Sequence, residues 1–284
     1  MSSDSSTSFV VSCIQTHPMM MDVEGNVARQ KPMIEEAINK GAKLIVLPEC
    51  STTGWVFVDA AEARSVAEAV PGGPTCNVWQ EYCTKNDVHI VAGIVEVDGE
   101  NVYNTAVLLG PKGFIGKFRK MHLWAVEKNF YTPGDLGLPV FDTPLGRIGM
   151  HICYDGWFNE SYRLLALAKA DILCVPANWV PVPTQKSELP VMANLLCMTN
   201  AHTNLVYIAA ASRVGEERGQ PFIGRSIVVD HAGWPLAGPA SGEREEIIYA
   251  TVDPIGSRPE REGNPFNQPL GDRRTDAYEV VTHS

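Results

Sequence analysis

The sequence predicts an α/β protein whose sheet combines parallel and antiparallel strands. Short runs rich in valine and isoleucine recur along the whole chain, and glycine, proline or aspartate flanks them, which is typical of strands. Segments with a helical spacing of apolar residues separate several of these runs, and that alternation favours an α/β sheet. A glycine-rich turn at residues 110–117 joins two runs directly, which indicates an antiparallel pair.

Each expected strand is an apolar run bounded by turn residues. We expect strands at residues 9–16, 43–49, 89–97, 104–110, 114–123, 146–154, 171–177, 205–212, 226–230 and 246–252. Helical patterns are expected at residues 26–42, 73–87, 159–170 and 187–204. Gly41 lies where a glycine commonly follows the end of a helix, whereas Pro32 disfavours helix in the first turn of the 26–42 segment.

Length and charge limit the classes of protein. The chain has 284 residues, enough for one large domain, and its net charge of -10 argues against binding to nucleic acid or anionic membranes. We find no polar linker of ten or more residues and no repeat. We therefore expect a disordered tail over 1–8, one folded domain over 9–255, and a polar arm over 256–284 that packs on a neighbouring subunit.

The cysteines and the N-terminus favour a reducing, cytoplasmic location. The first residues, MSSDSSTSF, lack the basic and apolar regions of an export signal, and no apolar run reaches the ~20 residues of a membrane helix. The seven cysteines are scattered and form no CxxC pair, so we expect neither a disulfide framework nor a zinc site. Motifs typical of dinucleotide, nucleotide, zincin and serine-hydrolase sites are also absent.

Three positions at the ends of apolar strands carry candidate chemistry. Glu49 follows "LIVLP", Lys120 lies in "GKFRKMHLW" beside Lys117 and Arg119, and Cys153 precedes a helical pattern. Each also has a structural interpretation: a turn acid, a solvated edge strand and a buried inert thiol. Strand alternation places Lys120 opposite the other two cations, so we expect it to point inward.

Considered together, the three residues suggest nucleophilic catalysis. A thiol is mostly protonated at neutral pH, so an active Cys153 needs a base or a nearby cation. Glu49 is a candidate base, and Lys120 could lower the thiol pKa and stabilise an oxyanion. A Cys–His pair with His151 is the competing interpretation, but a turn at the cysteine would separate the two side chains, so we treat His151 as structural.

The segments "LPE" (47–49), "KFRKMHL" (117–123) and "CYDGWFNE" (153–160) resemble, in order, the three signatures of the nitrilase, or carbon–nitrogen hydrolase, superfamily. The likeness extends over nearly the whole chain. It implies a four-layer αββα sandwich and a homodimer, or a higher homo-oligomer, built across the helices beside the cysteine. It also implies a Glu–Lys–Cys triad of Glu49, Lys120 and Cys153.

The resemblance further implies a second glutamate, matched by Glu127, for which a surface loop acid is an equal alternative. The backbone N–H of Tyr154 would join Lys120 in holding an oxyanion, and no metal or organic cofactor is needed. The expected substrate pocket follows the strand ends and is lined by Trp55, Trp124, Asn178 and Trp179. Trp157 is expected in the core or at a dimer contact.

The favoured function is an amidase that releases ammonia from a small amide through a thioester acyl-enzyme. Nitrilases of the family usually have tryptophan and glutamate after the cysteine, whereas this chain has Tyr154 and Asp155, which resembles amidases and carbamoylases. A nitrilase and an N-carbamoyl amidohydrolase remain alternatives, and Arg213 is a candidate carboxylate clamp in the latter. A non-catalytic binding protein that retains the fold is the alternative outside enzymes.

Overall fold

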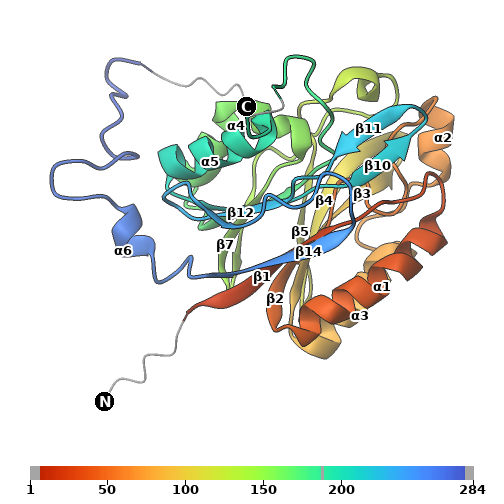
Figure 1. Cartoon of the computed structure of the whole chain (residues 1–284), viewed down its shortest axis with the longest axis horizontal. Helices are drawn as coiled ribbons and strands as arrows, with labels where there is room; N and C mark the ends of the chain where they lie inside the picture. Colours follow the sequence, from red (N-terminus) through yellow and green to blue (C-terminus); the bar gives the residue numbers. More distant parts are fainter. Residues whose placement is uncertain (1–6, 187–188, 279–284) are drawn as a thin grey trace.

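Two six-stranded sheets form the centre of the computed structural model, which describes residues 7–186 and 189–278 (Figure 1). The first sheet contains, in spatial order, β14 (Glu246–Val252), β1 (Phe9–Gln15), β2 (Ala42–Val46), β3 (His89–Asp98), β4 (Asn101–Gly110) and β5 (Gly113–Arg119). The second contains β13 (Pro235–Ala237), β12 (Ile227–Val229), β9 (Tyr207–Ala211), β8 (Ile172–Pro176), β7 (Gly146–Met150) and β6 (Val140–Thr143). In each sheet the three central strands are parallel and their outer neighbours antiparallel.

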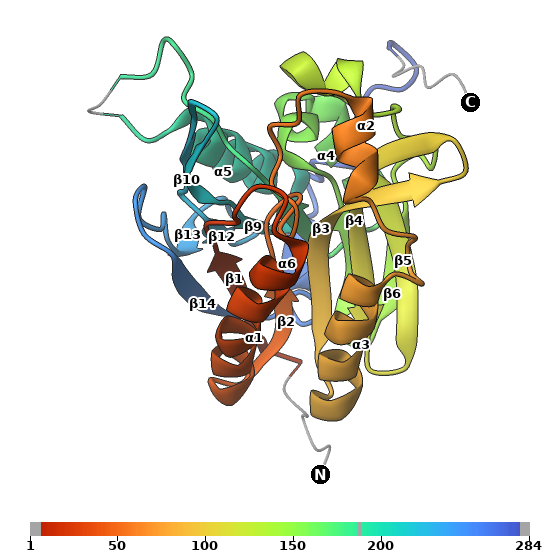
Figure 2. The same ribbon diagram turned by 90° about the vertical axis from the view of Figure 1, so that its right-hand side faces the viewer.

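Helices cover the outer face of each sheet, which confirms the αββα sandwich (Figure 2). The first sheet carries α1 (Val23–Asn39) and α3 (Pro74–Asn86), and the second carries α4 (Asn159–Leu167) and α5 (Met192–Asn204). Smaller elements are α2 (Ala60–Ser65), α6 (Arg258–Arg261), the 3-10 helices η1 (Ala125–Asn129) and η2 (Cys153–Trp157), and the hairpin of β10 (Val214–Glu217) and β11 (Gln220–Ile223).

Strand β2 shows why the central runs are continuously apolar. Leu44 and Val46 face the core between the two sheets, whereas Ile45 faces the helices. Both faces of such a strand are buried, so the polar alternation of a half-exposed strand is lost. The same property explains why the sequence located these strands well.

Helix α1 begins earlier than expected and contains Pro32 in its interior. The Asp22 side chain accepts a hydrogen bond from the Gly25 backbone at 3.0 Å and so caps the N-terminus. Pro32 is exposed, so water can bind the carbonyl that lacks an N–H partner. The expectation that Pro32 disfavours helix in the first turn of the 26–42 segment was therefore wrong.

Three strands end before the residues that were assigned to them. Strands β2, β5 and β7 end at Val46, Arg119 and Met150, so Glu49, Lys120 and Cys153 lie on the turns that follow. After β5 the Lys120 backbone N–H still donates to the Asn104 carbonyl of β4 at 2.8 Å, whereas the Lys120 carbonyl accepts from the Gly134 backbone N–H at 2.8 Å. Apolar residues continue past each turn, which is why the sequence extended these strands too far.

Parts of the expected ends lie outside the described residues: 1–6 of the tail, 187 and 188 of the helix at 187–204, and 279–284 of the arm. The described end of the arm follows α6 without further regular structure and exposes 89% of Phe266. Packing of this arm on a partner stays a prediction. Among the described residues, no helix combines the length and apolar character needed to cross a bilayer.

Gly93 allows β3 to approach the turn that carries Glu49. A Cβ atom at this position would lie 2.4 Å from the Glu49 Cα and 2.6 Å from the Pro48 carbonyl oxygen. We predict that Gly93→Ala lowers the free energy of unfolding by about 1–3 kcal/mol, because backbone atoms must move. Gly72→Ala is the control, since its Cβ would have no neighbour within 4 Å. Urea denaturation measures both, and equal stabilities would contradict the prediction.

Candidate active site

Glu49 lies on the turn after β2 and is fully buried. The backbone of Gly93 holds this turn on both sides, because its N–H donates to the Pro48 carbonyl and its carbonyl accepts from Ser51, each at 3.0 Å. One carboxylate oxygen, Oε1, accepts hydrogen bonds from Lys120 at 2.7 Å and from Asn104 at 2.6 Å. The other oxygen, Oε2, has no hydrogen-bond partner among the described residues and can accept a proton.

Lys120 lies directly after β5, and its side chain is completely buried. Its ammonium contacts two carboxylates, Glu49 at 2.7 Å and Glu127 at 2.8 Å. Burial alone would lower the pKa of Lys120, but the charges of Glu127 and Glu49 outweigh burial and raise it well above its ordinary value. The lysine is therefore a fixed positive charge, and the inward orientation predicted for it is confirmed.

Glu127 lies in η1 and is fully buried, so its interpretation as a surface loop acid is wrong. Its carboxylate accepts hydrogen bonds from the Trp55 indole N–H at 2.7 Å and the Trp124 backbone N–H at 2.6 Å. Asn104 of β4 donates to both glutamates, to Glu127 at 2.9 Å. The sequence reasoning missed Asn104, which stands at the start of the apolar run of β4 and whose role depends on contacts with residues far away in the chain.

Burial and neighbouring charge both act on Glu49. Burial raises the pKa of this carboxyl above its ordinary value of 4.5 and outweighs the opposite effect of the Lys120 ammonium. The negative charge of Glu127 raises the pKa of Glu49 further. The Glu49 carboxylate is consequently a stronger proton acceptor than a glutamate in water.

Cys153 is the first residue of η2 and is half-buried, with a positive φ of 44°. Such a backbone conformation is uncommon for a residue other than glycine, and it turns the side chain away from the line of β7. The backbone of Asn178 lowers the pKa of the thiol. Helix α4 begins at residue 159 as expected, but the 3-10 turn intervenes between it and the thiol.

The expected lowering of the Cys153 pKa by Lys120 is not the net result. Burial and the negative charge of Glu49 raise the pKa of the thiol, and they outweigh the lowering by the Lys120 ammonium. The thiol therefore keeps its proton in the unliganded protein. A nucleophilic Cys153 would need a base to take that proton at the moment of attack.

The two histidines near Cys153 have structural surroundings. His122 donates its backbone N–H to Asp155 at 2.9 Å and places its ring nitrogen Nδ1 2.7 Å from the same oxygen, which ties the lysine loop to the turn of η2. The buried ring of His151 packs edge-on against Tyr162, and neither of its nitrogens has a hydrogen-bond partner among the described residues. Burial lowers the pKa of His151 to about 4. His151 is thus not hydrogen-bonded to the thiol.

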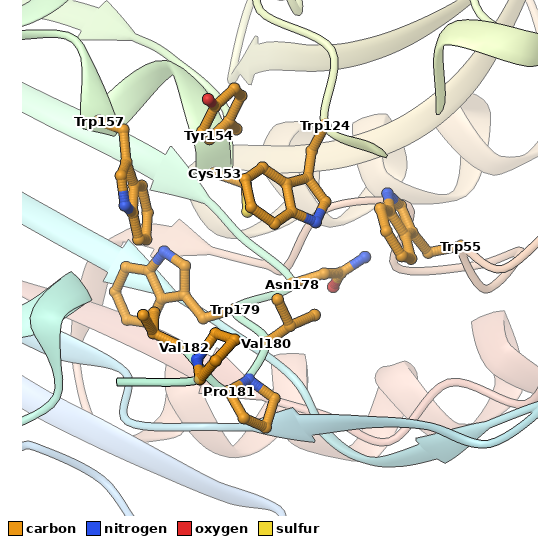
Figure 3. Close-up of a pocket in the computed structure, with 11 residues that line it drawn as sticks. Trp55, Trp124, Cys153, Tyr154, Trp157, Asn178, Trp179, Val180, Pro181 and Val182 are labelled. Atoms are coloured by element: carbon orange, nitrogen blue, oxygen red, sulfur yellow. The ribbon is translucent and has the colours of Figure 1, made fainter. Parts of the chain in front are cut away.

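A pocket of about 210 Å³ opens onto Cys153 (Figure 3). It brings together every residue expected to line it: Trp55, Trp124, Asn178 and Trp179. Trp157 also lines it and at the same time packs against the core cluster beneath the second sheet, so its assignment to the core is confirmed in part, and a dimer contact stays a prediction. Its remaining walls come from Tyr154 and residues 180–183, and none of the described lining residues is Asp, Glu, Lys, Arg or His.

Asn178 is the polar exception in this pocket. Only 3% of the residue is exposed, and neither atom of its side-chain amide, Oδ1 or Nδ2, has a hydrogen-bond partner among the described residues. Figure 3 shows the amide at the side of the pocket between Trp124 and Trp55. Buried polar atoms are seldom left unpaired, so this amide is available to a ligand.

The other candidate cations are occupied elsewhere. Lys117 and Arg119 both form ion pairs with buried Glu96, which replaces their interpretation as solvated residues of an edge strand. Arg213 is buried in an ion pair with Glu217 and does not line the pocket. Within residues 7–186 and 189–278, no group of three or more His, Cys, Asp or Glu side chains is placed to hold a metal ion.

The contacts of Lys120 predict that its replacement lowers the stability of the fold strongly. Lys120→Met leaves Glu49 and Glu127 buried together without a counter-charge, so we expect a loss of about 3–5 kcal/mol in the free energy of unfolding. Lys40→Met is the control, because Lys40 pairs with Glu36 at 3.2 Å with both side chains more than half exposed; its loss should stay below about 1 kcal/mol. Similar losses in the two variants would refute this account of the buried cluster.

Comparison with known proteins agrees with this geometry. The family model described as carbon-nitrogen hydrolase matches residues 10–259. The chain is 40% identical to a nitrilase of Pyrococcus abyssi over 94% of this chain and 98% of the relative, and 31% identical to human omega-amidase NIT2 over 87% and 89%. The crystal structure of yeast Nit3, a member of branch 10 of the nitrilase superfamily, superposes with a TM-score of 0.80 at 30% identity, covering 92% of this chain and 96% of Nit3. These matches favour an enzyme over a binding protein, and the chain belongs to the carbon–nitrogen hydrolase family of the nitrilase superfamily.

Proposed function

We propose that this chain is a cysteine-dependent amidase that releases ammonia from a small, uncharged amide. The observation that carries the proposal is the buried cluster of Glu49, Lys120 and Glu127, whose charges act on a thiol that opens into an apolar pocket. The cluster supplies a base and a fixed cation, which are the two groups that a protonated thiol needs for acyl transfer.

In the first half of the reaction, Cys153 is acylated. The free oxygen of Glu49 takes the thiol proton, and the sulfur attacks the carbonyl carbon of the amide. The Lys120 ammonium and the Tyr154 backbone N–H stabilise the oxyanion that forms. Glu49 then returns the proton to the leaving nitrogen, the carbon–nitrogen bond breaks, and ammonia departs.

In the second half, water releases the acid. Glu49 accepts a proton from a water molecule, whose oxygen attacks the thioester carbonyl, and Glu127 helps to hold that water in place. The carbon–sulfur bond breaks, and the sulfur regains a proton from Glu49. The cycle therefore consumes one amide and one water and yields one carboxylic acid and one ammonia, with no change of oxidation state.

The pocket supports an uncharged acyl group. Tryptophan, valine and proline side chains form most of its walls, and a charged group would lose its hydration there without a counter-ion. The amide of Asn178 adds one hydrogen-bonding partner for a polar substituent of the substrate. Since Arg213 is already paired with Glu217, the described lining of the pocket offers no clamp for the carboxylate of an N-carbamoyl amino acid.

A nitrile is the second candidate substrate, and the 40% identity to a nitrilase of Pyrococcus abyssi favours it. The same thiol would add to the nitrile carbon, and two water molecules would complete hydrolysis to the acid and ammonia.

The proposed location and assembly follow from the cysteines and the arm. The cytoplasm is the proposed location, which fits the seven free cysteines. We also propose a homodimer, because the described part of the arm exposes 89% of Phe266 and 54% of Tyr278. Aromatic side chains of this size bury a large apolar area when a partner subunit covers them.

The first functional experiment compares matched substrates. Purified protein is incubated with the amide, nitrile and N-carbamoyl forms of aliphatic and aromatic acids, each in a neutral and a charged version, and released ammonia is measured. We expect neutral amides to be hydrolysed at least about tenfold faster than charged ones. Cys153→Ala should abolish release without unfolding the protein.

The outcome identifies the reaction class. Release from nitriles would assign the nitrilase reaction to the same site, and release from N-carbamoyl substrates alone would contradict the role given to Arg213. Ammonia release that survives in Cys153→Ala would refute the thioester mechanism.

Asn178→Leu tests whether the unpaired amide serves the substrate. Leucine has a similar shape but no polar atoms, so the variant should be as stable as the parent or more stable, because a buried unpaired amide is removed. Its kcat/KM should nevertheless fall by about tenfold, a loss typical of one hydrogen bond to substrate. Thermal denaturation and ammonia release measure the two effects. A variant with unchanged kcat/KM would exclude Asn178 from substrate recognition.

A further inference from the structure

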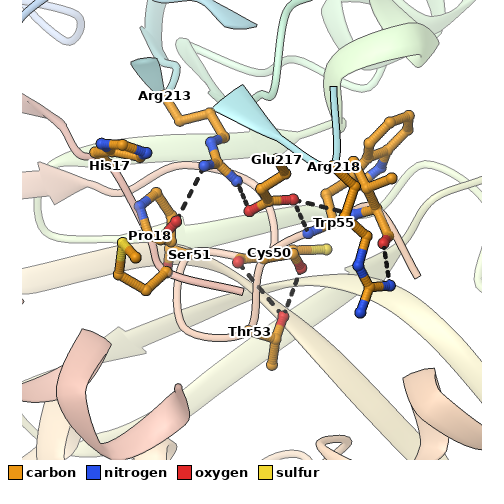
Figure 4. Close-up of polar contacts among 12 residues, drawn as sticks. His17, Pro18, Cys50, Ser51, Thr53, Trp55, Arg213, Glu217 and Arg218 are labelled. Atoms are coloured by element: carbon orange, nitrogen blue, oxygen red, sulfur yellow. Dashed lines mark hydrogen bonds and ion pairs between the residues drawn. The ribbon is translucent and has the colours of Figure 1, made fainter. Parts of the chain in front are cut away.

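A buried ion pair outside the pocket holds the loop that carries Trp55 (Figure 4). Arg213 follows β9, and Glu217 ends β10. The exposed fractions of their side chains are 0% and 3%. Arg213 also donates to the Pro18 carbonyl at 3.0 Å, and its guanidinium lies 4.2 Å from the centre of the Phe222 ring.

The second oxygen of Glu217 points at the loop. It accepts the backbone N–H groups of Trp55 at 2.9 Å and Val56 at 3.1 Å. Residues 47–59 form no helix or strand, so this segment depends on such contacts for its position. The edge-on packing of Trp55 against Phe222, with ring centres 6.1 Å apart, adds a second contact between the same loop and hairpin.

The Trp55 side chain continues the chain of contacts into the candidate active site. Its indole N–H donates to Glu127 at 2.7 Å, and Glu127 contacts the Lys120 ammonium at 2.8 Å. Hydrogen bonds and ion pairs therefore connect Glu217 to Lys120 without a gap. Each link joins groups that are almost fully buried, where hydrogen bonds are strong and misplacement is costly.

We infer that Glu217, held by Arg213, is a positioning residue that sets the place of Glu127 through the backbone and indole of Trp55. If Glu217 and Arg213 only stabilised the fold, apolar side chains of similar volume could replace them, since such replacements of a buried ion pair often cost no stability. The carboxylate is needed here because it can accept two neighbouring backbone N–H groups and an arginine together. Glu217 fixes the direction of the Trp55 indole in this way.

A second arginine–glutamate pair, formed by Arg218 of the hairpin and Glu62 of α2, supplies a matched control. Arg218 pairs with Glu62 through two contacts of 2.6 Å, so Glu62 also connects the hairpin to another element by an arginine–glutamate pair. Glu62 binds the Val58 backbone N–H but not Trp55. Glu62→Gln therefore makes the same chemical change as Glu217→Gln without touching the contacts of Trp55.

The test measures the rate at which iodoacetamide alkylates Cys153, followed by peptide mass mapping. This readout needs no knowledge of the natural substrate, although it depends on Glu49 taking the thiol proton. We expect Glu217→Gln to slow alkylation by about tenfold. Trp55→Phe, which keeps an aromatic side chain but loses the indole N–H, should do the same. Glu62→Gln should stay within about twofold of the parent.

The double variant Glu217→Gln/Trp55→Phe tests whether Glu217 acts through the Trp55 indole. If Glu217 acts through the indole, Cys153 is alkylated no more slowly in the double variant than in either single variant. The inference is wrong if the two reductions in rate multiply, or if Cys153 of Glu217→Gln is alkylated at the parental rate. If Glu217→Gln does not fold because Arg213 is left unpaired, the variant Arg213→Met/Glu217→Gln removes both members of the ion pair. This variant then takes the place of Glu217→Gln in the comparison with Trp55→Phe. Ammonia release measured in parallel separates this inference from the proposed amidase activity, since the alkylation cycle gives its answer even if no substrate is hydrolysed.

Discussion

The Lys120 ammonium, buried between two carboxylates, is the interaction on which the rest of the site depends. Removing three charges from water is costly, and the arrangement is stable only because every charge has close partners. Lys120 neutralises Glu49 and Glu127, and the amide of Asn104 donates to both acids. The second oxygen of Glu49 has no hydrogen-bond partner among the described residues, so it is free to accept a proton.

The pocket and the cluster support each other. The walls of the pocket are mostly apolar and the Lys120 side chain is completely buried, so the field of Lys120 is less screened there than at the protein surface. Trp55 belongs to both, because its ring lines the pocket and its N–H holds Glu127. A substitution of Trp55 in the pocket wall can consequently change the position of the Glu127 carboxylate.

The sequence predicted the sheets well because their central strands are continuously apolar. It missed shorter or more polar elements, whose residues carry no such pattern: β6, β10, β11, β13 and α2. Glu49, Lys120 and Cys153 were recognised since each stands beside an apolar run. The partners Asn104 and Glu217 were not identified, because their roles follow from contacts between segments far apart in the chain, which a single sequence does not reveal.

The proposed base and the proposed nucleophile come from different sheets. Glu49 follows β2 of the first sheet, whereas Cys153 follows β7 of the second, and the core between them packs Leu44 and Val46 against Met150 and its neighbours. The thickness of that apolar layer therefore sets the spacing of base and nucleophile. Substitutions in the interior that add or remove a methylene can change the rate of reaction without altering any residue of the site, so homologues with identical site residues can differ in reactivity through their cores alone.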